Sequence, residues 1–402
     1  MDERTAELLV ERLIRRVEQA NTYFLTKIGS SIKQIKKLTP TQAQQLVQIL
    51  KYGGNLDEII KQIAKYTGLN VADISDIFSA YAKQDRMFYE QFYKYRGIPF
   101  EESSALQLQR EALTRIAMNE MYNFTRDNAL GYTIDGKFYN LRDTYNKLLD
   151  DALLNVGQGK ETFDSAVRKT LQQIGGSGLR TIEYESGRSV RLDSTIRMHL
   201  KGRLRELHNE NQLIIGEEIG ADGVEISVHE NPAPDHEKAQ GRQFSNEEYQ
   251  KLQAGQEATD YRGIKVNLDH DHKNGYRPIS EMNCYHYVFS VILGVNEPEY
   301  NEKQLKEIID RNEKGFEYDG KHYTMYQGEQ LQRNLEREIR KQKDIHILAK
   351  SSGDIDLMSK AQLKITQLTR KYHQLSEVSG LSTKMKRMSV SGYRRVAKIK
   401  LK

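Results

Sequence analysis

The sequence predicts an α+β protein that is predominantly α-helical. Over most of the chain, apolar residues recur at helical spacing. The run from 100 to 231 contains no proline, which permits long helices. From about 223 to 300 this pattern gives way to short alternating segments rich in Gly, Asn, His and Asp. We therefore expect five parts: an N-terminal helical region (1–130), a hairpin-helix connecting region (131–222), a central α+β module (223–300), C-terminal helices (301–380) and a basic tail (381–402).

The N-terminal region is predicted to consist of successive helices. Leu8, Leu9, Leu13 and Val17 form a helical stripe, and Thr39-Pro40 has the residue types of a helix start. Gly53-Gly54 should end that helix. Further helices are expected over about 56–66, from Asn70 or Asp73, and over 101–129.

Three hairpins are predicted from turn dipeptides between short apolar runs. The turns are Asp135-Gly136, Ser186-Gly187 and Asp319-Gly320. After the second hairpin, Asp193 or Ser194 should cap a helix that carries Ile196, Leu200, Leu204 and Leu207 and reaches Gly220.

The central module should begin with a strand, because Val224, Ile226 and Val228 alternate with polar residues. Helical structure resumes at Asn301, whose capping box Gln304 completes. Two long amphipathic helices follow, at about 326–350 and 354–378. They are expected to form an antiparallel pair, or alternatively a stalk that packs on a partner.

Composition limits the classes of protein. Cys284 is the lone cysteine of 402 residues, so no internal disulfide can form. The first residues are acidic where a signal peptide would be basic and then apolar, and no run approaches 18 apolar residues. We expect a protein made in the cytoplasm, with no membrane span.

The C-terminal tail is strongly basic. From Leu381 onward it has eight basic residues and no acid, although the net charge of the whole chain is only +5. Such a tail either contacts nucleic-acid phosphates without sequence preference or is a solvated terminus. The candidate DNA contacts are Lys384, Lys386, Arg387, Arg394, Arg395, Lys398 and Lys400.

Histidines gather in the central module beside the only cysteine. Zinc takes four nitrogen or sulfur ligands in a tetrahedron, and the set that fits is His229, His236, Cys284 and His286. Alternation along a strand would put Cys284 and His286 on one face. The alternative is that these side chains hydrogen-bond their loops and bind no metal.

A nuclease is the enzymatic alternative. The string Leu268-Asp-His270-Asp-His272-Lys-Asn-Gly275 is similar to the first strand and turn of HNH-type nucleases, in which a His acts as general base near a divalent metal. Those enzymes often carry Cys pairs, which this chain lacks. The sequence also has no P-loop, dinucleotide-binding glycine motif, Gly-x-Ser-x-Gly elbow or His-Glu-x-x-His helix.

Longer motifs resemble the phage minor capsid protein 2 family, a branch of the phage head-morphogenesis proteins. They are the hairpin Tyr184-Glu-Ser-Gly187-Arg, the stretch Val228-His229-Glu-Asn-Pro-Ala-Pro-Asp-His236, the pair Asn283-Cys284-Tyr285-His286 with Glu297-Pro298-x-Tyr300, and the segments Gln332-Arg-Asn-Leu-Glu-Arg337 and Met388-Ser-Val-Ser-Gly-Tyr393. Ala233 stands where the family usually has Arg, and Tyr285 where it often has a basic residue.

This resemblance implies a structural virion protein rather than an enzyme. Members are expected at the portal vertex or in the head interior, and in the host cytoplasm during assembly. The implied partners are the portal protein, capsid or scaffold proteins and packaged double-stranded DNA. The implied role is in head assembly, DNA packaging or DNA ejection.

Overall fold

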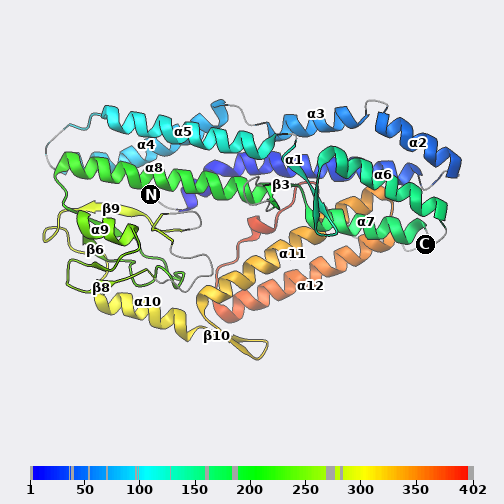
Figure 1. The fold of residues 1–402 in the computed structure, drawn as a ribbon. Helices are drawn as coiled ribbons and strands as arrows, with labels where there is room; N and C mark the ends of the chain where they lie inside the picture. Colours follow the sequence, from blue (N-terminus) through cyan, green and yellow to red (C-terminus); the bar gives the residue numbers. More distant parts are fainter. Residues whose placement is uncertain are drawn as a thin grey trace. The chain divides into compact units, whose positions relative to one another are not determined.

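The computed structural model describes residues 3–35, 37, 40–52, 55–68, 71–95, 97, 99–126, 128–158, 163–182, 189–268, 277–280 and 284–396. These residues are mostly helical, with small antiparallel sheets (Figure 1). The predicted α+β, predominantly helical class is confirmed. Among the helices described, none has both the length and the apolar character that crossing a bilayer requires.

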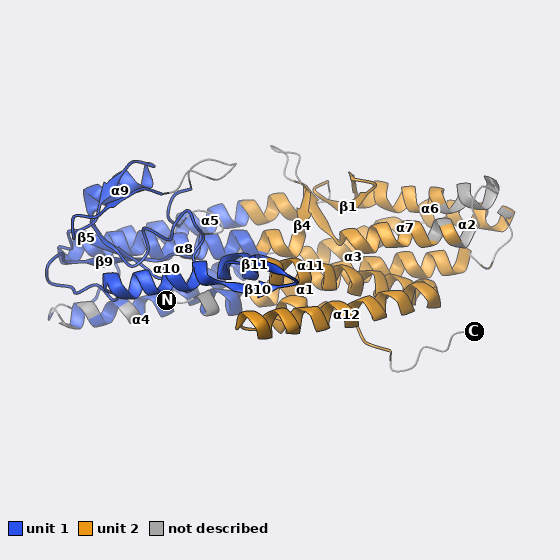
Figure 2. Cartoon of the chain, turned by 90° about the horizontal axis from the view of Figure 1, so that it is seen from below, with its two compact units in different colours: residues 1–10, 70–119, 197–330 blue, residues 11–69, 120–196, 331–402 orange. Residues whose placement is uncertain are grey.

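The chain forms two compact units, each assembled from separated segments (Figure 2). Unit 1 comprises residues 1–10, 70–119 and 197–330, and unit 2 comprises residues 11–69, 120–196 and 331–402. Helices α1 (Glu3–Ile35), α5 (Ser104–Thr125), α8 (Leu192–Ile219) and α11 (Met325–Ser352) contribute residues to both units. The division into five consecutive parts stays a prediction.

Unit 2 contains a four-stranded antiparallel sheet of order β2-β1-β3-β4. Its strands are β1 (Leu130–Ile134), β2 (Lys137–Asn140), β3 (Arg180–Ile182) and β4 (Ser189–Arg191). Asp135 and Gly136 link β1 to β2 with φ of 49° and 78°, as a tight hairpin turn requires. The first predicted hairpin is therefore confirmed; the second is confirmed by the β3–β4 pairing, and its Ser-Gly turn lies outside the described residues.

Unit 2 also contains several helices. They are α2 (Pro40–Tyr52), α3 (Asn55–Thr67), α6 (Leu141–Gln158), α7 (Phe163–Ser177) and α12 (Ile355–Ser379), with parts of α1, α5 and α11. The predicted C-terminal pair is confirmed as antiparallel. Tyr372 donates to Glu336 at 3.1 Å and Gln332 to Ser376 at 2.8 Å, so residue numbers rise on one helix as they fall on the other.

Buried charges connect the segments of unit 2. Asp344 of α11 is fully buried and accepts hydrogen bonds from Arg191 (2.9 Å) and from Asn21 of α1 (3.0 Å). Asn21 in turn accepts the Tyr132 hydroxyl (2.8 Å) and the Leu179 backbone N–H (2.9 Å). Two strands and two helices are thereby tied to one carboxylate and one amide.

Unit 1 combines helices α4 (Val71–Tyr95), α9 (Asn246–Gln253) and α10 (Glu302–Lys314) with parts of α5 and α8. Ile196 in unit 2, and Leu200, Leu204 and Leu207 in unit 1, are fully buried, as the helical stripe of α8 predicts. A buried polar contact joins α4 to α8, with an Asp85 carboxylate oxygen lying 2.6 Å from His208 Nδ1.

The central module lies wholly in unit 1. Its main sheet has the order β6-β5-β9, from β5 (Gly223–Ile226), β6 (Gln243–Ser245) and β9 (Val288–Val291). Strands β7 (Ala258–Thr259) and β8 (Lys265–Val266) pair separately, and β10 (Phe316–Tyr318) and β11 (Lys321–Tyr323) form the third predicted hairpin. The capping box of α10, Asn301 with Gln304, is confirmed.

Helix α9 was not anticipated in this module. Ser245 caps it by accepting the Glu248 N–H at 3.2 Å. Only Tyr249 and Leu252 of its eight residues are buried. This apolar stripe is too short to predict a helix from the sequence.

We expect Glu18→Gln to stabilise the protein at high pH. Burial and the nearby Asp193 raise the pKa of Glu18 to about 7, from 4.5 in the unfolded chain, and Arg340 partly opposes this shift. The favourable contribution of protonated Glu18 is complete below about pH 4.5 and is lost as pH rises through 7. Gln cannot ionise, so the variant should gain about 1–2 kcal/mol at pH 8 and nothing near pH 4.5.

Denaturant unfolding of both proteins at the two pH values measures this difference. Glu377→Gln, at an exposed position of α12, is the matched control and should change stability at neither pH. An equal gain for Glu18→Gln at both pH values would contradict the assignment of the effect to a buried carboxylate.

Candidate metal centre

The pairing of β5 with β9 places His236 close to Cys284 and His286. Ile226 pairs with Val288, and one residue beyond, the Ser227 N–H donates to the Tyr287 carbonyl at 2.8 Å. The loop after β5 carries His236, and the segment just before β9 carries Cys284 and His286. Because the two strands run antiparallel, both segments leave the sheet at the same end.

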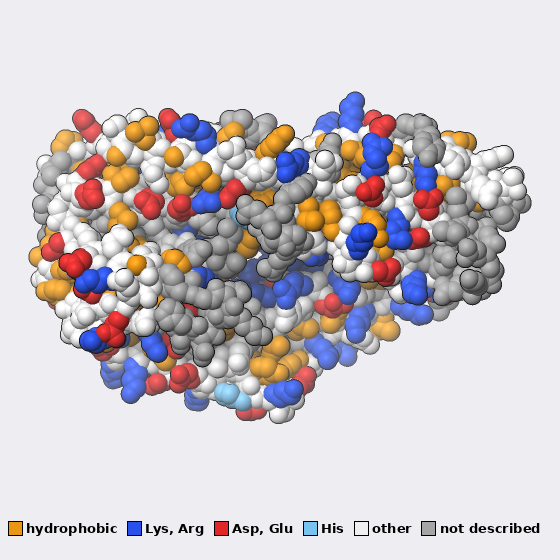
Figure 3. Space-filling model, viewed as in Figure 1, with side chains coloured by type: hydrophobic (Ala, Val, Ile, Leu, Met, Phe, Trp, Pro, Cys, Tyr) orange, Lys and Arg blue, Asp and Glu red, His pale blue; other side chains and the backbone are white. Residues whose placement is uncertain are grey.

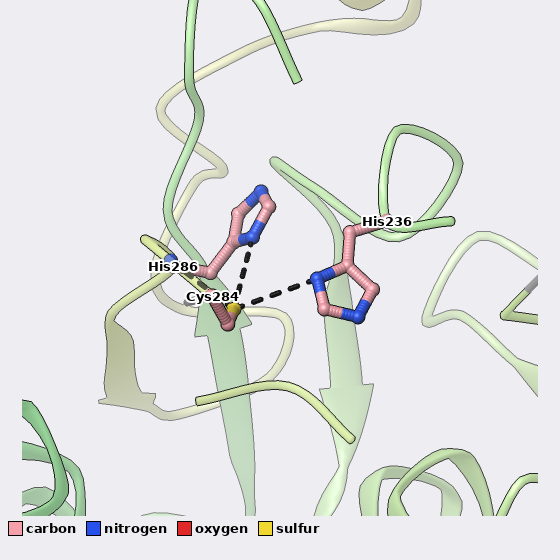
Figure 4. A group of neighbouring side chains, drawn as sticks. All are labelled: His236, Cys284 and His286. Atoms are coloured by element: carbon pink, nitrogen blue, oxygen red, sulfur yellow. Dashed lines mark hydrogen bonds between the residues drawn. The ribbon is translucent and has the colours of Figure 1, made fainter. Parts of the chain in front are cut away.

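His236, Cys284 and His286 form a buried cluster (Figure 4). Their exposed fractions are 1%, 1% and 3%, and one ligand atom from each lies within 4.8 Å of the others. Cys284 Sγ is 3.4 Å from Nδ1 of His236 and 3.4 Å from Nδ1 of His286. Sulfur and nitrogen ligands of one tetrahedral zinc ion would be about 3.5 Å apart, so this group could hold a metal ion.

The second ring nitrogen of His236 has a defined role. His236 Nε2 lies 2.8 Å from the Arg277 carbonyl oxygen, which can only accept, so Nε2 carries the proton. In the neutral ring, Nδ1 then has its lone pair directed at the sulfur. A metal-binding histidine typically donates its other N–H to a carbonyl or carboxylate in this manner.

An ion pair between Asp235 and the Arg277 side chain holds the Arg277 carbonyl in place. Arg277 donates Nε and a terminal nitrogen to the two oxygens of buried Asp235, at 2.8 and 2.9 Å. Both residues support the centre, yet sequence analysis did not select either of them. Arg277 contacts His236 through its backbone oxygen, and no side-chain pattern in a sequence predicts such a contact. Asp235 could have been selected because it directly precedes the candidate ligand His236.

Backbone donors surround the Cys284 sulfur. Sγ accepts the N–H of Ser280 at 3.2 Å and that of His286 at 3.4 Å. Burial alone would raise the pKa of Cys284, but the hydrogen bond from His236 and its charge outweigh burial and hold this pKa below the usual range. The thiolate, the form that binds metals, is thereby favoured.

The imidazoles differ in their electrostatics. Burial opposes protonation of His236, yet its hydrogen bond and charge interaction with Cys284 raise its pKa above the usual range. Burial, together with His229 and His236, pushes the pKa of His286 well below the usual range. Neutral imidazole is the form that coordinates metal.

His229 is the predicted ligand that the structure places apart. Its ring centre is 4.5 Å from that of His286, but it does not belong to the group of three ligand atoms within 4.8 Å of one another. Burial lowers its pKa, and within the described part of the chain its Nε2 has no hydrogen-bond partner. Three of the four predicted ligands are therefore brought together, with His229 beside them.

The other predicted site residues are described only in part. His270 and His272 of the nuclease-like string, and Lys398 and Lys400 of the tail, fall outside the described residues. In the described part of the tail, Lys386, Arg394 and Arg395 are exposed, and Lys384 and Arg387 are half-buried. The described part of the tail packs on helices of unit 2, because Met388 belongs to an apolar cluster with Ile339 and Tyr372.

Comparison with known proteins identifies a family. A family model described as phage minor capsid protein 2 matches residues 1–376, a range that includes the whole metal centre. No curated protein and no solved structure matches the chain.

Proposed function

The chain belongs to the phage minor capsid protein 2 family, and from this premise we propose that it is a portal-associated component of the virion that aids head assembly, DNA packaging or DNA ejection. The family match over 1–376 is the observation that carries the proposal. It makes the chain a structural component of the phage capsid. Attachment at the portal vertex goes beyond what the family match gives, and it is the part that we propose.

Long helices with apolar side chains on their solvent face support a role in assembly. Helix α5 buries one stripe, which includes Leu106 and Leu113, in unit 1. Outside this stripe Leu108 and Ile116 are 64% and 41% exposed. Exposed apolar side chains flanked by charged ones, here Glu111 and Arg115, are typical of a surface that a partner covers. We propose this face of α5 for contact with the portal protein.

We propose that the basic tail lies against packaged DNA. Lys384, Lys386, Arg387, Arg394 and Arg395 give it charge in its described part, and its anchoring through Met388 would hold that charge at a fixed place on unit 2. Phosphate neutralisation by such residues requires no base contacts.

We further propose that His236, Cys284 and His286 bind zinc as a structural ion, with His229 as the candidate fourth ligand. The ion would join the loop after β5 to the segment before β9. It would replace the proton shared by Cys284 and His236, so binding should release a proton. The nuclease alternative depends on His270 and His272, which lie outside the described residues.

For the portal contact, we expect the double variant Leu108→Glu, Ile116→Glu to weaken association with the portal protein of the same phage about tenfold, because two charges would be buried in an apolar contact. Co-purification with tagged portal protein from co-expressing cells measures this. Val295→Glu, at a 72% exposed loop position, is the control and should bind normally.

Wild-type chain that neither co-purifies with portal protein nor occurs in purified virions would refute the portal proposal. Normal binding by the double variant would instead remove α5 as the contact.

For zinc, we expect one equivalent per chain and a higher Tm with zinc than with a chelator. Zinc at a hundredfold its Kd should add about 3 kcal/mol, or on the order of 5–10 °C for a unit of this size. Cys284→Ser should abolish this rise, whereas His373→Ala, at an exposed position of α12, should preserve it.

Cobalt provides a spectroscopic readout, since a thiolate-to-cobalt charge-transfer band should appear with wild type and be missing with Cys284→Ser. Less than about half an equivalent of zinc, with Tm independent of the chelator, would show that the cluster is held by hydrogen bonds alone.

A further inference from the structure

Unit 2 contains a basic groove that neither the metal centre nor the tail includes. It has a volume of about 820 Å³ and is lined by α7, α11, α12 and strands of the β2-β1-β3-β4 sheet. Among its described lining residues, five are basic and one is acidic: Lys169, Arg180, Lys341, Lys360, Lys364 and Asp135. Figure 3 shows Lys and Arg side chains gathered over α11 and α12 on this face of the unit.

Helical spacing places the lysines of α7 and α12 on the side of each helix that lines the groove. Positions 169, 172, 173 and 176 of α7 line it, as do positions 357, 360, 361 and 364 of α12. Each set follows the i, i+3, i+4, i+7 rule for one helix face. Gly175 lets α7 approach α11 closely, because a Cβ there would lie 2.8 Å from the Ile345 Cα.

Three of the five basic side chains of the groove, Lys169, Lys360 and Lys364, are exposed and have no ion-pair partner among the described residues. Lys341 lies 3.7 Å from Glu338. Asp135 accepts a hydrogen bond from Gln173, and Arg180 donates to Ser189 Oγ at 3.0 Å. Several cations that share one concave surface concentrate a positive potential there and attract a polyanion.

The rest of the lining favours phosphate over an acidic protein. Thr133, Gln172 and Gln342 add hydroxyl and amide groups, which commonly accompany Lys and Arg at phosphates. The side chains of the apolar lining residues Ile345 and Leu357 are only 5% and 2% exposed.

We propose that this groove binds the phosphate backbone of double-stranded DNA without sequence preference. The identification of the polyanion as DNA rests on the proposed function, because packaged DNA is the polyanion inside a phage head. The groove is a site separate from the tail residues, although both belong to unit 2.

The tail lies on the same helix as two of the groove lysines. Gln362 of α12 hydrogen-bonds both backbone groups of Val396, donating to its carbonyl at 2.8 Å and accepting its N–H at 3.0 Å. The exposed Arg394 and Arg395 immediately precede Val396. Helix α12 thus carries basic side chains of its own, at Lys360 and Lys364, and those of the docked tail.

The test measures binding of the purified full-length chain to a random-sequence DNA duplex over a range of salt concentrations. The triple variant Lys169→Gln, Lys360→Gln, Lys364→Gln should bind at least about tenfold more weakly, with the salt slope reduced by about 2–3. The matched control Lys303→Gln, Lys306→Gln, Lys321→Gln removes the same charge from exposed positions of unit 1 and should bind like wild type.

A Lys-to-Arg triple variant at the three groove positions keeps the charge and should also bind like wild type. Unchanged DNA binding by the Gln variant, or an equal loss in the unit 1 control, would overturn the proposal. Tighter binding of polyglutamate than of the duplex at the same salt concentration would also overturn it, by assigning the groove to an acidic protein. The groove variant should still co-purify with portal protein, so failure of the portal proposal and failure of the groove are distinct results.

Discussion

The fold of unit 2 depends on one buried carboxylate, that of Asp344. It has no exposed surface, and a bare carboxylate there would be strongly unfavourable. Arg191 and Asn21 satisfy it, and Arg191 also donates to Asp193 at 3.1 Å, which Arg340 contacts in turn. Burial raises the pKa of Asp344, against the lowering effect of Arg191. Removing one partner of such a network typically lowers the free energy of unfolding by about 3–5 kcal/mol, because the remaining charge is buried without a partner.

This network also holds in place β4 and α11, two of the elements that line the basic groove. Arg191 ends β4, whose first residue Ser189 lines the groove, and Asp344 lies on α11 between the lining residues Lys341 and Ile345. In unit 1 the corresponding constraint is the β5–β9 pairing, which brings His236 to Cys284 and His286. In both units a short sheet places side chains that helices alone would leave separated.

Much of this was predictable from local patterns. Helix periodicity, the Asp-Gly turns at 135–136 and 319–320, and the antiparallel pair α11–α12 follow from short-range rules. His236, Cys284 and His286 could be chosen because few residue types bind zinc. The groove could not be predicted, because each of its lysines, taken singly, is typical of the solvent-exposed side of a helix. Asp344 likewise follows Lys341 and Lys343 in sequence and looks like an ordinary exposed acid. Its burial depends on Asn21, which is 323 residues away.

We propose that this capsid protein contacts a protein partner through the apolar face of α5 and DNA through the basic groove and the tail, and that its buried centre binds zinc. The central proposal is its position in the virion. Asymmetric cryo-electron microscopy of the portal vertex in DNA-filled virions tests that claim most directly. We expect density for this chain against the portal protein, with the groove of unit 2 beside packaged DNA. Density for the chain that lies only in the capsid shell, or a vertex that lacks the chain, would contradict the proposed position.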